Sequence, residues 1–271
     1  MRIRKANTAL LGVASFLAFV TAADADGRRS IKDEPYAAPY IWTGAYVGAF
    51  LGAAWTNADT HNTANPGGLV GLFKGGLADG GLPSNVSQDS AALTGGIVVG
   101  YNFQNGSIVY GIEADISALG HDESSSVTTH TGFNPILTTT TETRVDWLGT
   151  LRARVGMLTT PNTLAYLTGG LAFGNVDAST TIIIPAGGCV ANAYCSVGSA
   201  SEVRFGWTIG GGLEHAFSRG WSLKAEYLYF NLGDVTYTGH ATAGFVSGLP
   251  TLDSRVSVDG HIARVGLNYK F

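Results

Sequence analysis

Eight charged side chains stand at alternate positions of segments that are otherwise apolar. They are the residues of this chain whose types and spacing could most readily carry out chemistry. Four are acids and four are bases: Glu113, Asp115, Arg152, Arg154, Glu214, Lys224, Glu226 and Arg264. Such a set could serve a catalytic site or line a conducting path. Because unpaired charges in a low-dielectric space are costly and paired ones are tolerated, the equal numbers favour a network of salt bridges that fills an interior.

The segments that carry these charges have a two-residue period. From Ala263 to Phe271 every second residue is apolar or aromatic, and polar residues such as Arg264 and Asn268 lie between them. This period places alternate side chains on opposite faces of a β-strand. The same pattern predicts eight strands, at residues 42–55, 93–104, 108–118, 145–157, 164–174, 203–217, 221–231 and 263–271.

The connections between these strands alternate in length. Four long polar stretches are expected, at residues 56–92, 119–144, 175–202 and 232–254, and the short ones lie at 105–106, 159–162 and 218–220. Asn105 and Gly106 form the preferred dipeptide of a tight hairpin turn. Long extracellular loops and short periplasmic turns are typical of outer-membrane barrels. We therefore predict an all-β fold, an eight-stranded antiparallel up-and-down transmembrane barrel over residues 41–271, with both chain ends in the periplasm.

The first 25 residues have the features of an export signal. Arg2, Arg4 and Lys5 precede an apolar run, and Ala23 and Ala25 provide the small residues of a cleavage site. We expect export through the Sec pathway, cleavage near Ala25, a periplasmic lead at residues 26–40 and a final location in the cell outer membrane.

Composition excludes several classes of function. Without residues 1–25 the chain has 16 − 3 = 13 basic and 20 − 1 = 19 acidic residues, a net charge of −6, which disfavours a nucleic-acid partner. The histidines are scattered and no pair has metal-ligand spacing on one element, so we expect no metal and no cofactor. Tryptophan and tyrosine residues near strand ends, including Trp42, Tyr46 and Trp55, are expected to form the aromatic girdles of the two membrane interfaces.

Cys189 and Cys195 are the only cysteines and lie in the third long connection. Two nearby cysteines in an exported protein usually form a disulfide. We expect such a bond to close the tip of this loop.

Eight motifs follow one another along the chain: WTGAYVG at 42–48, GYN at 100–102, YGIEAD at 110–115, VDWLGTLRAR at 145–154, TGGLA at 168–172, GWTIGGGLE at 206–214, LKAEYLY at 223–229 and RVGLNYKF at 264–271. In this order they resemble the small outer-membrane β-barrel, or outer-membrane immunogenic protein, family of alphaproteobacteria. The resemblance implies an OmpA-like barrel that supports the envelope and displays surface loops. It also implies that the terminal aromatic Phe271, with Tyr269, is read by the barrel-assembly machinery.

Three functions follow, in order of preference. The first is a barrel filled by its own side chains, which stabilises the envelope, contacts outer-membrane lipid and lipopolysaccharide, and presents loops to an unknown surface ligand. The second is a narrow porin-like channel for small solutes. The third is a lipid-modifying hydrolase at the rim, for which His215 and nearby serines are the candidates. We expect the chain not to be an enzyme.

Overall fold

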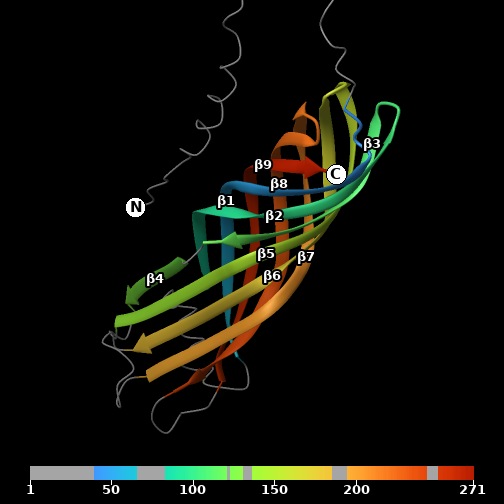
Figure 1. Cartoon of the computed structure of the whole chain (residues 1–271). Coiled ribbons are helices and arrows are strands. Elements are labelled where there is room, and N and C mark those ends of the chain that lie inside the picture. The colour runs from blue at the N-terminus through green and yellow to red at the C-terminus, as the bar shows by residue number, and fades with distance from the viewer. Residues whose placement is uncertain (1–39, 66–82, 121–122, 131–135, 185–193, 243–249) are drawn as a thin grey trace, which may run out of the picture. The chain divides into compact units, whose positions relative to one another are not determined.

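The computed structural model describes residues 40–65, 83–120, 123–130, 136–184, 194–242 and 250–271. The predicted signal peptide at 1–25 and nearly all of the lead at 26–40 lie outside these residues. Within them the chain forms strands: β1 Gly44–Ala64, β2 Asn85–Asn105, β3 Ile108–Leu119, β4 Glu123–His130, β5 Ile136–Thr160, β6 Thr163–Ile184, β7 Tyr194–Ser218, β8 Trp221–Ala241 and β9 Pro250–Lys270 (Figure 1). In this part of the chain no helix has the length and apolar character needed to cross a membrane.

Antiparallel pairing closes these strands into a ring. Strands that are neighbours in the chain pair with each other, except β3 and β4; β9 pairs with β1, and β3 pairs with β5. The short strand β4 takes over the edge of β5 where β3 ends. The pairing of β3 with β5 stops at Ala118 opposite Trp147, and that of β4 starts at Glu123 opposite Thr143. The ring therefore has eight positions, and the predicted eight-stranded antiparallel barrel is confirmed.

The strands are longer than the sequence pattern predicts. β1 continues from Trp55 to Ala64, so the first part of the predicted loop at 56–92 is strand. The period of two persists there, with Ala58 and Thr60 buried and Asp59 and His61 exposed. The outward face has become polar, however, because it has left the apolar band that meets lipid, which is about 25 Å tall. The predicted strand was defined by its apolar outward face, so it was predicted to end where that face becomes polar.

The three short turns lie where they were expected. Gly106 and Gly220 have φ values of 61° and 84°, which residues with a side chain rarely adopt. The third turn is the pair Pro161 and Asn162, between β5 and β6. These tight connections set the register of the neighbouring strands and therefore decide which side chains point inward.

Inward-facing side chains form three layers along the barrel. At the end with the short turns, Trp42 is 1% exposed and packs against Val109, Leu164, Tyr166 and Ala216. The charged residues form the middle layer. On the far side of them is a largely apolar layer, in which buried Thr56, Thr60 and Thr94 also face inward. Its apolar members are Ala54, Ala58, Leu119, Val145, Leu148, Ala172, Val176, Ala178, Leu228, Phe230, Leu232, Val235, Tyr237, Val256, Val258 and Ile262.

Two aromatic residues lie elsewhere than predicted. Trp42 and Tyr46 were expected in a membrane girdle, but both are buried inside the barrel. Trp42 precedes β1 and donates its backbone N–H to Oε1 of Gln104 at 2.9 Å, which holds the residue in the mouth of the barrel. Tyr46 lies on the inward face of β1, opposite to the face of Val47 and Leu51. The nearness of both residues to a strand end was a poor guide because it does not say which face they occupy.

One stretch of the wall lacks regular pairing. β7 and β8 pair at Val197 and His240, and again from Trp207 and Asn231, but not between those points. We call residues 198–206 and 232–239 the β7–β8 seam. Gly233 there has a φ of 74° and marks an irregularity in the pairing of β8 with β9. Its N–H donates to Oδ1 of Asn231 at 2.9 Å, a local bond that stabilises the bend.

The seam changes the burial of side chains on β7. Ala200 is half-buried and Glu202 is exposed, although both face inward by register. Their cross-strand partners on β6, Ala178 and Val176, are buried. These two inward positions of β7 are therefore more exposed than their partners on β6.

Candidate functional site: a charge network inside the barrel

The eight predicted charged residues all point into the barrel and contact one another. Glu113 and Asp115 come from β3, Arg152 and Arg154 from β5, and Glu214 from β7. β8 contributes Lys224 and Glu226, and β9 contributes Arg264. Each pair on one strand is separated by a single residue, so the period of two places both members on the inward face.

Arg152 connects three of the acids. Its guanidinium contacts the carboxylate of Glu113, and its Nη2 and Nη1 atoms lie 2.8 Å from Asp115 and 3.0 Å from Glu226. Its Nε also donates to Oγ1 of Thr150 at 3.0 Å. The planar guanidinium suits such an arrangement because its five N–H donors are held in a fixed fork.

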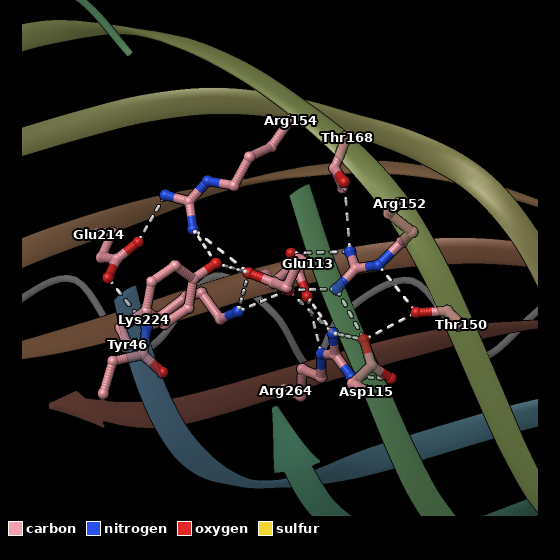
Figure 2. A network of polar contacts seen from close by, with 12 residues as sticks. Tyr46, Glu113, Asp115, Thr150, Arg152, Arg154, Thr168, Glu214, Lys224 and Arg264 are labelled. Carbon is pink, nitrogen blue, oxygen red and sulfur yellow. Dashed lines mark hydrogen bonds and ion pairs between the residues drawn. The ribbon is translucent and has the colours of Figure 1, made fainter. Parts of the chain in front are cut away.

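The other three cations complete the network around Glu113 (Figure 2). Arg154 contacts Glu214 at 2.6 Å and Glu113 at 3.2 Å, and Nζ of Lys224 lies 2.9 Å from Glu113. Figure 2 shows Glu113 in the middle, with Arg154 and Lys224 on one side and Arg152 on the other.

Arg264 closes the network from the last strand. It contacts Asp115 at 3.0 Å and Glu226 at 2.5 Å. Every acid therefore has at least one cationic partner, and every cation has at least one acid.

Neutral side chains also donate hydrogen bonds to the carboxylate oxygens of the network. The hydroxyls of Tyr46 and Tyr166 donate to Glu113 at 2.6 Å and to Glu226 at 2.9 Å. Ser222 and Asn268 donate to Glu214 at 2.6 and 2.9 Å. Sequence reasoning missed these residues as site members. They stand on the same inward faces as the charges, so the two-residue period was the signal that could have found them.

The network is buried and electrically balanced. All eight residues are buried, Arg152 to 1% exposure, and four positive charges face four negative ones. The guanidiniums of Arg154 and Arg264 also lie 4.3 Å from the ring of Tyr166 and 4.0 Å from that of Phe50. Ion pairs of this kind fill space and fix geometry.

The remaining candidate residues do not join this network. His215 is exposed on β7, with Nδ1 3.0 Å from Oγ1 of Thr163. In the part of the chain that the structure describes, no group of three or more metal-ligating side chains is placed to hold an ion. Cys195 is buried at the start of β7, whereas Cys189 lies outside the described residues, so their disulfide stays a prediction.

Comparison with known proteins agrees with this geometry. The family model described as "Outer membrane protein beta-barrel domain" matches residues 12–271. The chain belongs to this family of outer-membrane β-barrels.

Relatives of this outer-membrane barrel support the same assignment. The chain is 32% identical to a 31 kDa outer-membrane immunogenic protein of Brucella melitensis, over 97% of this chain and 98% of the relative. It is 28% identical to a 25 kDa outer-membrane immunogenic protein of Brucella abortus, over 86% of this chain and 80% of the relative. The predicted resemblance and the location in the outer membrane are confirmed. Among solved structures, OprG of Pseudomonas aeruginosa is similar at 12% identity, over 86% of this chain and 98% of that chain, with a TM-score of 0.48.

Membership of the family fixes the orientation of the barrel interior. The short turns of an outer-membrane barrel face the periplasm and its long loops face outward. Trp42 therefore lies at the periplasmic end of the interior, and the apolar layer lies between the charge network and the end of the barrel that faces the cell surface.

Proposed function

We propose that this outer-membrane barrel is a closed structural protein of the envelope that displays its outer loops. The observation that carries the proposal is the continuous filling of the lumen by three layers of buried side chains. A pathway for ions would have to displace a tryptophan, break a balanced salt-bridge network and wet an apolar layer. Apolar constrictions resist wetting, and buried ion pairs are expensive to separate.

The outer parts of the strands support the display of loops. β5 and β7 have 25 residues each, whereas a strand needs about ten to cross the membrane. The strands are thus longer than one membrane crossing requires. The Brucella relatives are named immunogenic proteins, and exposure of the corresponding surface in this chain fits that name. The surface ligand, the assembly machinery and the outer-leaflet lipid remain proposed partners.

Conductance across a planar bilayer tests the closed barrel. We expect the purified, refolded chain to insert without steady single-channel openings, and heat-modified migration on a gel would verify that it is folded. The variant Trp42→Ala should also stay closed, because two further layers remain. Steady openings in the wild-type protein would favour the alternative, a narrow channel for small solutes.

Catalysis is not part of the proposed function. The charged residues that could act as acids or bases are buried and paired with one another. A rim hydrolase at His215 remains the third hypothesis. Turnover of a lipid ester that is lost in His215→Ala would support that hypothesis against ours.

A further inference from the structure

One edge of β2 has no strand beside it in the outer half of the barrel. β2 pairs with β1 from Asn85 to Asn102, but its pairing with β3 ends where Thr94 lies opposite Leu119. β4, which follows β3 in the chain, pairs with β5 alone (Figure 1). Among the described residues no strand therefore pairs with residues 85–91 on the side toward β4. We call this segment the open β2 edge.

The neighbouring ladder tells which backbone groups point out of this edge. The N–H of Asn62 donates to the C=O of Ser84 at 2.8 Å, so these two residues are a hydrogen-bonded pair between β1 and the start of β2. Hydrogen-bonded pairs alternate along an antiparallel ladder. In this register the even-numbered residues of the edge bond to β1, whereas Ser87, Asp89 and Ala91 turn their N–H and C=O groups away from β1. These three residues offer donors and acceptors to an added strand.

The open β2 edge lies outside the hydrocarbon of the membrane. The outward residues of β2 include no charged residue from Phe103 to Leu93, which is about one membrane crossing of nine to eleven residues. Beyond Leu93 the outward face carries Asp89, Ser87 and Asn85, and all three are exposed. Unpaired backbone groups are too costly among lipid chains but are tolerated beyond them. The edge is therefore accessible from the cell surface.

The edge is held in place from inside the barrel. Val86 and Gln88 face inward and are 5% and 6% exposed. Nε2 of Gln88 donates to the backbone oxygen of Thr141 at 2.5 Å, which ties β2 to β5 on the inner side of the gap. Oε1 of Gln88 is buried and has no hydrogen-bond partner. A fixed edge lowers the ordering cost of binding, and this oxygen leaves one acceptor for a partner to satisfy.

Charge around the edge indicates the kind of partner. Asp89 is exposed on the edge itself, and Asp59 is exposed on the outward face of β1. Asn57 lies opposite both Asp89 and Asp259, and its amide donates to Asp259 at 3.3 Å. Carboxylates on one face favour cationic side chains at the facing positions of a neighbouring strand. The period of two then places basic residues outward in the partner and small, apolar or hydroxyl residues inward.

We propose that the open β2 edge binds an extended basic peptide segment, which adds to the sheet as a strand antiparallel to β2. Its backbone exchanges hydrogen bonds with Ser87, Asp89 and Ala91. A lysine or arginine of the peptide lies beside Asp89, and a hydroxyl opposite Gln88 donates to Oε1. The strand edge makes this contact, so the inference goes beyond the display of loops.

A second copy of this chain fits the edge less well. All copies stand in the same orientation in the outer membrane, so a two-fold axis between them runs along the membrane normal. Equal edges related by such an axis run in the same direction and would pair in parallel. Parallel pairing is slightly less stable than antiparallel pairing, which a separate peptide can adopt.

Binding of the synthetic peptide KVKTKVK, blocked at both ends, to the full refolded chain in detergent micelles tests this proposal. We expect saturable binding that weakens as salt is added. The same peptide with methyl groups on the backbone nitrogens of its two inner lysines keeps its charge and loses two donors. It should bind about tenfold more weakly. Equal binding of the two peptides would mean that charge alone attracts them, and would overturn the proposal.

Variants of the edge provide the matching test on the protein. Ser87→Pro with Ala91→Pro removes two N–H groups that point out of the edge and keeps the bonds of β2 to β1. Peptide binding should fall about tenfold, whereas Ser87→Thr with Ala91→Thr should change it less than about twofold. Heat-modified migration on a gel verifies that both variants fold. Equal losses in the two double variants would refute the role of the backbone.

Amide hydrogen exchange of the wild-type chain needs no variant. The N–H groups of Ser87, Asp89 and Ala91 should exchange about tenfold more slowly once the peptide is bound, whereas that of Gln88, which bonds to β1, should change little. Protection of the three edge amides before peptide is added would mean that this chain or a second copy already covers the edge, and would overturn the proposal. None of these measurements depends on conductance, so their failure would leave the closed barrel standing.

Discussion

Replacing Arg152 with methionine would show how strongly the charge network holds the barrel together. Methionine keeps an unbranched chain that is shorter than that of arginine and carries no charge, so the lumen is left with four acids and three bases. Each acid that loses Arg152 keeps another cation: Lys224 remains beside Glu113, and Arg264 remains beside Asp115 and Glu226. The cost is therefore that of one unbalanced buried charge and of the charge-assisted hydrogen bonds lost with it.

This cost can be bounded from known buried pairs. Removing one partner of a buried ion pair destabilises a protein by about 3–5 kcal/mol. We expect about 4 kcal/mol for Arg152→Met, or roughly 1,000-fold in the unfolding equilibrium. Urea unfolding of the refolded barrel in lipid vesicles, followed by tryptophan fluorescence, would measure it.

A compensating substitution separates charge balance from packing. Glu226 lies 3.0 Å from Arg152. Glu226→Gln in the Arg152→Met background leaves three acids and three bases, so it restores the charge balance of the network. The double variant should be more stable than the sum of the two single losses by about 2 kcal/mol. Arg204→Met is the control, since Arg204 and Glu202 form a pair with side chains 33% and 49% exposed. Its cost should stay below about 1 kcal/mol. Additive losses in the double variant, or equal losses for Arg152→Met and Arg204→Met, would refute this account of the network.

Three further outcomes are expected. Trp42→Ala should cost about 3–5 kcal/mol in the same unfolding assay, because it empties a buried site, and Trp55→Ala at a lipid-facing site should cost less. In a background without the native cysteines, Ala200→Cys in the β7–β8 seam should react with a water-soluble maleimide at least tenfold faster than its cross-strand neighbour Ala178→Cys; equal rates would mean that the seam is closed. Deleting Phe271, which is 77% exposed, should reduce the yield of barrel in the membrane more than the stability of what has folded, and a normal yield would contradict its role in assembly.

The sequence predicted the inward set of charges because alternation is a local property. Glu113, Arg152 and Lys224 could each be assigned to the polar face of a strand from their immediate neighbours. Their pairing could not be predicted, because it depends on which strands face one another across the lumen. Arg152, for example, contacts Glu113 on an adjacent strand and Glu226 on β8, which is not its neighbour in the ring.

Other features had no local signal. Tyr46 and Trp42 were assigned to a girdle because aromatic residues near strand ends usually lie there. Both are buried inside the barrel, Tyr46 because it is on the inward face of β1 and Trp42 because it packs against other inward side chains. Gly233 looked like part of a loop, and only the observed strand shows that it marks a bend in the wall. The extensions of the strands were missed because their outward faces are as polar as a loop.

Arg264 links closure of the barrel to neutralisation of its interior. Strands β1 to β8 carry Glu113, Asp115, Glu214 and Glu226 against three cations, so without β9 their inward faces have one excess negative charge. β9 brings Arg264 to Asp115 and Glu226, and the same strand completes the wall through its pairing with β1 and β8. The strand that seals the barrel is therefore also the strand that neutralises its interior.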